Sequence, residues 1–205
     1  MPLNRAAALL KSMYRSDPQI SDKFGYVRLG GRPKWKDPFI DLKMFSLMVP
    51  GTENAIFGAD FERDIGHRDF SCNAIYYDPI NAVLIDPSGR GITDATEMCL
   101  HLVSDARLRG AVQRAQIVIR FVKFMTRGFK PSIVTTETIR KDYMPDLSAM
   151  DGGERLRYFK AQIINKCSPS EREASLDRFR ETMIAFGAEV EWNDFFEPLK
   201  EDFLS

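Results

Sequence analysis

The stretch DFERDIGHRDFSCNAIYYDPINAVLIDPSGRG, residues 60–91, decides the fold and carries the densest chemistry of the chain. Its first half gathers four titratable side chains within six residues: Asp64, His67, Arg68 and Asp69. An arginine whose direction is fixed by a neighbouring aspartate suits bidentate capture of a phosphate group. We therefore expect Arg68 and Asp69 to form a structural pair that can also contact a nucleotide. The alternative is a surface ion pair beside a turn, which contributes about 0–1 kcal/mol.

The second half of this stretch predicts two paired strands. Residues 71–77 and 82–86 are apolar and β-branched or aromatic, and turn-forming residues lie between them. Asn73 falls inside the first of these expected strands, where its amide could bond a sugar hydroxyl or a base edge. Asp86-Pro87, followed by Gly89 and Gly91, predicts a tight turn at the end of the pair.

Upstream of this stretch, the pattern predicts one helix and two more strands. Residues 4–15 predict a helix with Leu9, Leu10 and Met13 on its apolar face. Residues 24–29 and 39–47 predict strands, and Asp41 alternates with Phe39 on the second.

Downstream, the period becomes helical. Residues 105–127 predict a helix with an apolar face made of Leu108, Ala111, Val112, Ala115, Val118, Ile119, Val122 and Met125. A mostly basic stripe follows another face: Arg109, Gln113, Gln116, Arg120, Lys123 and Arg127. This stripe is interpreted as a solvated face or as a surface for RNA phosphates. Ser168-Pro169-Ser170-Glu171 predicts a helix start, and the helix would bury Leu176, Phe179, Met183 and Phe186 and end at Gly187.

These elements predict an α+β protein: a small mixed sheet of about four strands in residues 20–90, followed by a helical region. We divide the chain into a head at 1–104, a neck-like helical segment at 105–144 and a helical extension at 145–205. Residues 145–153, with Pro145, Gly152 and Gly153, are the best linker candidate.

Composition excludes several classes of protein. The chain has 205 residues, of which 44% are hydrophobic, enough for a buried core. No apolar run approaches the roughly 20 residues that span a bilayer, so no membrane association is expected. Three widely spaced cysteines (Cys72, Cys99 and Cys167) form no C-x-x-C pair and indicate free thiols in a cytoplasmic protein.

Charge is balanced overall, with 29 basic and 29 acidic residues, but it is unevenly distributed. Residues 1–36 and 105–141 are net basic, whereas 37–104 and 142–205 are net acidic. Basic surface beside a cleft with carboxylates suits a polyanionic substrate, although alternating charge also serves solubility.

The segment Arg68-Asp69-Phe70-Ser71-Cys72-Asn73-Ala74 resembles the R-D-F-T-I-N-A motif of poly(A) polymerases and CCA-adding tRNA nucleotidyltransferases. Ile85-Asp86-Pro87-Ser88-Gly89 resembles the family's later D-P-x-G-G segment, and Arg114 to Phe121 its helix R-x-L-R-A-x-R-F. The resemblance covers about residues 20–130. It implies a nucleotidyltransferase fold, with transfer of a nucleotide from an NTP to an RNA 3′ end.

The resemblance also implies roles for individual residues. It makes Arg68, Asp69, Asn73 and His67 the candidates for nucleotide binding, and Arg114 and Arg120 the candidates for RNA or phosphate contact. Asp41 would be the catalytic residue and a ligand of Mg²⁺ or Mn²⁺, the two-metal cofactor of such transfers.

The sequence departs from the family at the metal site. It contains no D-x-D pair, His67 stands in place of an arginine, and Ile117 occupies the position of a second arginine in the later helix. Three explanations stay open: the acids were lost in evolution, the chain is a truncated form, or another chain supplies them. Asp64, Asp69, Asp86 and Asp94 are the carboxylates to test for proximity to Asp41.

Two functions follow from these observations. The first is nucleotide transfer, on a site that is degenerate because the D-x-D pair is absent; the second is a non-catalytic module that binds a nucleotide, RNA or a protein. NTP and RNA are the expected ligands. A second copy or a partner chain could cover an exposed sheet edge.

Overall fold

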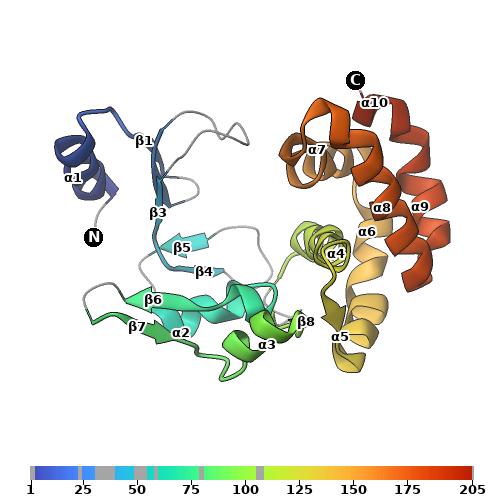
Figure 1. The fold of residues 1–205 in the computed structure, drawn as a ribbon, viewed down its shortest axis with the longest axis horizontal. Coiled ribbons are helices and arrows are strands. Elements are labelled where there is room, and N and C mark those ends of the chain that lie inside the picture. The colour runs from blue at the N-terminus through green and yellow to red at the C-terminus, as the bar shows by residue number, and fades with distance from the viewer. Residues whose placement is uncertain are drawn as a thin grey trace.

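The α+β class is confirmed by the computed structural model, which describes residues 3–22, 25–30, 40–48, 55–57, 60–78, 81–104 and 109–204. Figure 1 shows small strands and short helices in the first half of the chain and a stack of helices in the second half, with α4 between them. None of the helices in these ranges is both long enough and apolar enough to cross a membrane.

The N-terminal helix α1 (Leu3–Tyr14) packs on a three-stranded antiparallel sheet of β1 (Gln19–Ser21), β2 (Tyr26–Leu29) and β3 (Ile40–Lys43). The helix forms as predicted, but its buried face differs. Leu10 is buried together with Leu3, Ala6 and Ala7, whereas Leu9 and Met13 are 49% and 62% exposed. The two alanines allow close approach to Val27 and Leu29, so the narrow side of the helix faces the sheet.

The strands form several small sheets instead of one sheet of about four strands. The expected strand over 39–47 is interrupted after β3, and β4 (Ser46–Met48) pairs with β5 (Ala55–Phe57) in a separate two-stranded sheet. Phe39 lies outside the described residues. β6 (Tyr76–Asp78) and β7 (Val83–Ile85) form the predicted antiparallel pair.

The strand expected over 71–77 begins only at Tyr76, because Ser71–Asn73 is a turn of 3-10 helix. The backbone N–H of Asn73 donates to Phe70 O, and that of Ala74 donates to Ser71 O. Phe70 is fully buried and bridges to Leu102. Burial of that ring turns the chain before the strand can start, so Asn73 lies on a turn and not inside a strand.

The remaining elements are mainly helical and follow in chain order: α2 (Phe61–Asp64), α3 (Gly91–Glu97), β8 (Cys99–Leu100), α4 (Ala111–Met125), β9 (Lys130–Pro131), α5 (Ile133–Thr138), α6 (Met144–Ala149), α7 (Gly152–Gln162), α8 (Arg172–Phe186), α9 (Glu189–Phe195) and α10 (Lys200–Leu204). A π-helical turn, Ile139–Tyr143, joins α5 to α6. β8 and β9 pair in parallel. The expected linker at 145–153 contains most of α6 and the start of α7, with only Met150 and Asp151 between them.

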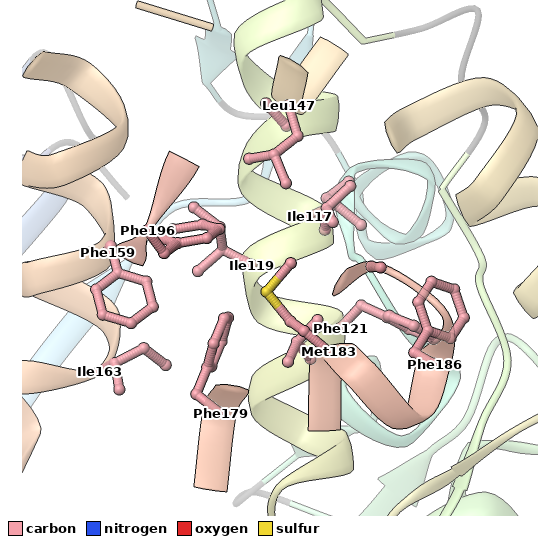
Figure 2. Packing of buried hydrophobic residues seen from close by; sticks show 14 of the residues in the cluster. Ile117, Ile119, Phe121, Leu147, Phe159, Ile163, Phe179, Met183, Phe186 and Phe196 are labelled. Carbon is pink, nitrogen blue, oxygen red and sulfur yellow. The ribbon is translucent and has the colours of Figure 1, made fainter. Parts of the chain in front are cut away.

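Helix α4 is the centre of the main core. Ala115, Val118, Ile119 and Val122 are buried as predicted, and Ile117 and Phe121 are buried as well. Figure 2 shows Ile117, Ile119 and Phe121 on α4, with Phe159 of α7, Phe179 of α8 and Phe196, just after α9, close to it. Leu108, which was expected on this face, lies outside the described residues. The helix is buried on more than one face because elements pack on both sides of it.

Helix α8 begins and ends as the sequence predicts. Ser168 and Glu171 form a capping box, and a 3-10 turn (Pro169–Glu171) leads into the helix. Leu176, Phe179, Met183 and Phe186 are buried, and Gly187 ends the helix at φ +84°. This left-handed conformation costs a glycine little, which explains the sharp stop.

Candidate functional site

The site begins with a short turn that fixes the direction of Arg68. Helix α2 places Asp64 one turn before Arg68, and a 3-10 turn (Ile65–His67) closes with the Arg68 N–H donating to Ile65 O at 2.9 Å. Arg68 Nε donates to Asp64 Oδ2 at 2.7 Å, and its Nη2 lies 2.5 Å from the same oxygen. The Tyr76 hydroxyl donates to Asp64 Oδ2 at 2.8 Å, and the Arg68 guanidinium lies 5.4 Å from the Tyr76 ring centroid.

The expected pair between Arg68 and Asp69 does not form. Asp69 is buried, and its carboxylate accepts from Arg120 Nε of helix α4 and from Asn73 Nδ2, the latter at 3.1 Å. Consecutive side chains in an extended backbone point to opposite sides, so Arg68 and Asp69 take different partners. The aspartate that holds Arg68 is Asp64, four residues earlier.

Backbone bonds join this motif to the helical half of the chain. The N–H of Ser71 donates to His101 O at 2.9 Å, and the N–H of Val103 donates to Asp69 O at 3.0 Å. On the other side of the same segment, Ser132 N–H donates to Leu100 O at 3.0 Å. Residues 98–104 therefore lie between the motif and the start of α5, and they set the distance from Asp69 to α4.

A pocket of about 210 Å³ opens where the motif meets α4. Five of the predicted site residues line it: His67, Arg68, Asp69, Asn73 and Arg120. Five others complete the lining: Arg109, Gln113, Gln116, Ile117 and Tyr158. Typical pockets for drug-sized ligands measure about 300–1,000 Å³, so this pocket is smaller than a typical ligand site.

The pocket has an excess of positive charge held in fixed directions. Three guanidinium groups (Arg68, Arg109 and Arg120) share it with one carboxylate, Asp69. Arg109 donates from Nε to Ser104 Oγ at 2.7 Å and from Nη2 to Arg68 O at 3.3 Å. Because both of these partners of Arg109 are neutral oxygens, its charge remains available to an anion.

The ionisation of the pocket follows from this arrangement. Burial alone would raise the pKa of Asp69, but the charge and hydrogen bond of Arg120 outweigh burial and lower it. Burial lowers the pKa of Arg109, and burial followed by the charge of Arg109 lowers the pKa of His67. Burial raises the pKa of Tyr158 to about 12 from its ordinary value of 10.0; the hydroxyl is protonated at neutral pH with or without this shift.

A second polar cluster stabilises the turn behind the motif. Asp94, buried in α3, accepts from the Ser71 hydroxyl and from Arg90 Nε at 2.9 Å, and its Oδ1 lies 3.0 Å from His101 Nδ1. Arg90 Nη2 lies 2.7 Å from His101 Nε2. Serine, histidine and aspartate occur together here, but the serine and the histidine both contact the aspartate directly. The cluster therefore lacks the serine–histidine contact of a nucleophile and its base, and it serves to position the turn.

Asp41 lies in β3, where its backbone pairs with Arg28 of β2. In the same strand, partial loss of hydration and then the charge of Arg68 lower the pKa of Lys43. The role of Asp41 as a catalytic residue and metal ligand stays a prediction.

The other four carboxylates named as candidates each have a structural partner. Asp64 holds Arg68, Asp69 holds Arg120, and Asp94 holds Arg90. Asp86 accepts from the Ser88 hydroxyl at 2.7 Å and from the Ile92 N–H at 3.1 Å. Within the described ranges, no three His, Cys, Asp or Glu side chains lie together so as to hold a metal ion. These residues do not fit the Mg²⁺ or Mn²⁺ site that the resemblance implies.

Arg114 is not among the residues that line the pocket, but its Nη1 donates to the carbonyl oxygen of Arg109, which does line it. Arg114 also donates from Nε to Asp146 Oδ2 at 2.6 Å and from Nη2 to Asp146 Oδ1 at 3.2 Å, joining α4 to α6. Its contact with RNA stays a prediction, as do the roles of the other predicted site residues.

Sequence reasoning missed Tyr158 as a site residue. The pattern predicted no helix over 152–162, and no sequence motif connects that region with Arg68. Arg109, Gln113 and Gln116 were visible only as members of a basic stripe. The sequence signal that could have identified them as site residues is that they lie in the same helical pattern as Arg120.

The structure has a nucleotidyltransferase-like α+β fold. Comparison with known proteins agrees: residues 43–101 match the family described as Poly A polymerase head domain. The chain is 30% identical over 122 residues to the Multifunctional CCA protein of Xylella fastidiosa (strain 9a5c), a match that covers 55% of this chain and 28% of that protein. These matches confirm the resemblance to poly(A) polymerases and CCA-adding enzymes that the Arg68 motif predicted.

Solved structures show the same fold. An apo form of a CCA-adding enzyme superposes with a TM-score of 0.65 at 18% identity, covering 92% of this chain and 43% of the other. The Bacillus stearothermophilus CCA-adding enzyme in complex with CTP gives a TM-score of 0.55 at 22% identity, covering 79% of this chain and 37% of the other. The chain thus spans less than half the length of these proteins.

Proposed function

We propose that this chain acts within RNA nucleotide transfer, and that its own described part binds the nucleoside triphosphate in the pocket between Arg68 and α4. The single observation that carries this proposal is the pocket itself. It unites His67, Arg68, Asp69 and Asn73 with Arg120, which lies 51 residues after Asp69 in the chain.

The chemistry of the pocket supports a nucleotide as the ligand. Arg68 and Arg109 supply fixed guanidinium groups for phosphate oxygens. Asn73 is exposed, and its amide can reach a hydroxyl or base edge while keeping its bond to Asp69. Tyr158, protonated at neutral pH, adds a hydroxyl donor and an aromatic face.

The described residues support binding more strongly than catalysis. Transfer of a nucleotide by two cations requires a cluster of carboxylates. The candidate acids near the motif are already engaged by arginines, by hydroxyls or by backbone N–H groups. Nucleotide binding with no metal cluster among the described residues would agree with a degenerate nucleotidyltransferase or with one whose acids lie elsewhere.

Isothermal titration of each NTP into the purified chain tests the proposal, with and without Mg²⁺ or Mn²⁺. Asn73→Ala and Arg68→Ala should weaken binding, Arg68→Ala by about tenfold or more because a charged hydrogen bond is worth about 1.5–3 kcal/mol. The matched control is Arg157→Ala, an arginine of α7 whose side chain is 79% exposed and outside the pocket. Thermal unfolding of each variant separates lost binding from lost folding.

The outcomes distinguish the two functions. Binding that requires a metal and is lost in both Asp41→Ala and Arg68→Ala would indicate a working transfer site, to be followed by an assay with RNA acceptors. Binding that needs no metal and is lost only in the pocket variants would indicate a non-catalytic nucleotide-binding module. No binding of any NTP by the folded chain would overturn the proposal.

A further inference from the structure

A second pocket, of about 380 Å³, lies between the C-terminal part of α4, the end of α7 and the first turns of α8. Four basic side chains line it: Lys123, Arg127, Lys166 and Arg178. No aspartate or glutamate of the described ranges is among its lining residues. A pocket with four cations and no carboxylate is built for an anion.

Two of these basic groups bond neutral oxygens. Lys123 Nζ lies 3.2 Å from Gln162 Oε1, and Arg178 Nη2 donates to Ser175 Oγ at 3.2 Å. None of the four lies within 4.0 Å of a carboxylate oxygen in the ranges that the structure describes. The overall charge of the protein is balanced, so this local excess of positive charge indicates an anionic ligand.

The cations also repel one another. Burial, and then the charges of Arg127, Arg120 and Lys166, lower the pKa of Lys123 to about 8. An anion bound among these groups would relieve that repulsion, and such stabilisation is the electrostatic gain that a phosphate site provides.

The pocket continues the line of the first one along the same two helices. Arg120 on α4 lines the first pocket, whereas Lys123, three residues later on α4, and Arg127, in the turn directly after that helix, line the second. On α7, Tyr158 lines the first and Gln162, four residues later, lines the second. Residues at these spacings share one helix face, and seven residues of helix advance by about 10 Å.

We propose that the second pocket binds a backbone phosphate of an RNA strand whose end lies at the first pocket. The strand would follow the basic face of α4 from Arg120 to Arg127, with Lys166 and Arg178 contacting the phosphate from the other side. The choice of RNA over a free anion rests on the proposed function of the first pocket; the anion site itself rests only on the four basic residues.

The test is binding of a short single-stranded RNA to the full chain, measured over a range of salt concentrations. The double variant Lys166→Ala with Arg178→Ala removes two exposed cations that form no ion pair within the described residues, so folding should persist. We expect about tenfold weaker RNA binding, and a salt dependence whose slope falls by about 0.7 because one phosphate is no longer neutralised. The charge-conserving variant Lys166→Arg should retain the affinity of the wild-type chain.

Two controls make the test specific. Arg180→Ala removes an exposed cation from the same helix as Arg178 but outside the pocket, and it should leave RNA affinity unchanged. NTP binding at the first pocket, measured in parallel, should be the same in the double variant, so failure of this inference and failure of the proposed function are separable.

Titration with inorganic pyrophosphate distinguishes the source of the phosphate. If pyrophosphate competes with RNA, and the double variant binds both ligands more weakly, the result supports the proposal. Pyrophosphate binding that depends on Lys166 and Arg178, with RNA affinity unaffected by their removal, would overturn the RNA assignment. Equal RNA affinity and equal salt slope in the wild-type chain and the double variant, with no pyrophosphate binding, would overturn the site altogether.

Discussion

Asp94 is the residue on which the turn behind the motif depends. Its carboxylate accepts from Ser71 and Arg90 and contacts His101 while its side chain is 3% exposed. Asp94→Asn should destabilise the chain by about 1–3 kcal/mol, because the charge is lost and one buried acceptor oxygen becomes an NH₂ donor that faces the donors around it. Urea unfolding measures this change, and Asp60→Asn, at an exposed site, should stay within about 0.5 kcal/mol of the wild-type chain. An Asp94→Asn variant as stable as the Asp60→Asn control would contradict this role.

The same residue predicts how stability depends on pH. Burial raises the pKa of Asp94, but hydrogen bonds from Arg90 and Ser71 outweigh it, so the folded-state pKa lies below the ordinary value of 3.8; that of Asp69 is lowered as well. A group with a lowered folded pKa stabilises the fold above its unfolded pKa and loses that contribution as pH falls through the folded value. The urea midpoint should therefore fall steeply below about pH 4.

Asp94→Asn should reduce that acid sensitivity, because asparagine does not titrate and so contributes nothing to the pH dependence of stability. Comparing urea midpoints at neutral pH and at about pH 3 for both proteins checks this. An equal fall in both proteins would assign the acid sensitivity to other carboxylates.

At this scale, sequence reasoning identified the right residues but paired them wrongly. Arg68 and Asp69 are adjacent in the motif, which suggested a pair, yet each found a partner that the local pattern could not reveal. Asp64 is within one helical turn, so the correct partner of Arg68 was accessible from spacing. Arg120, 51 residues from Asp69, required the packing of α4 against the motif.

At the scale of elements, the start of α3 depends on a close approach at Gly91. A Cβ built there would lie 2.6 Å from Ser71 O and 3.0 Å from Asp86 Oδ1. Gly91→Ala should lower the free energy of unfolding by about 1–3 kcal/mol, because the backbone at Ser71 or the turn at Asp86 must move to admit the methyl group. Gly152, in the first turn of α7, has no such neighbour within 4 Å among the described residues, and Gly152→Ala should be neutral or stabilising by up to about 1 kcal/mol.

Thermal unfolding of the two variants provides the comparison. If Gly91→Ala melts at or above the temperature of Gly152→Ala, the close approach is not a constraint in solution.

Elements with their own local signals were predicted well. Helix α8 has a capping box and a terminal glycine, and α4 has a long apolar period, so both were found with their main buried positions. The strands were predicted less accurately, because their ends depend on contacts between distant segments. The break after Lys43 and the 3-10 turn at Ser71 both arise from packing that no local pattern encodes.

At the scale of the whole molecule, Phe70 joins the motif to the helices. Its ring is fully buried, with centroids 6.3 Å from Phe121 and 5.4 Å from Phe124, both on α4. Phe70→Ala should destabilise by about 3–5 kcal/mol. The effect should extend to Trp192 in α9, because both residues belong to one buried cluster.

Fluorescence of Trp192 in a Trp35→Phe background reports this, since the chain has two tryptophans. Ile133→Ala, at a side chain that is 78% exposed, is the control and should leave the transition within about 0.5 kcal/mol. A Trp192 transition that does not move in Phe70→Ala would mean that the helices unfold independently of the motif.

The shared cluster has a consequence for modularity. The motif that resembles a catalytic head supplies the ring of Phe70 to a core that includes Leu100 of β8 and is otherwise built from α4 and the segments after it. A chimera joined at residue 104 would need to match Phe70, Leu100 and Leu102 to a foreign α4 before it could fold. Substitutions on the two sides of that junction are therefore expected to covary among homologues, and the motif and its helices should be inherited as one unit even though only the motif has a recognisable signature.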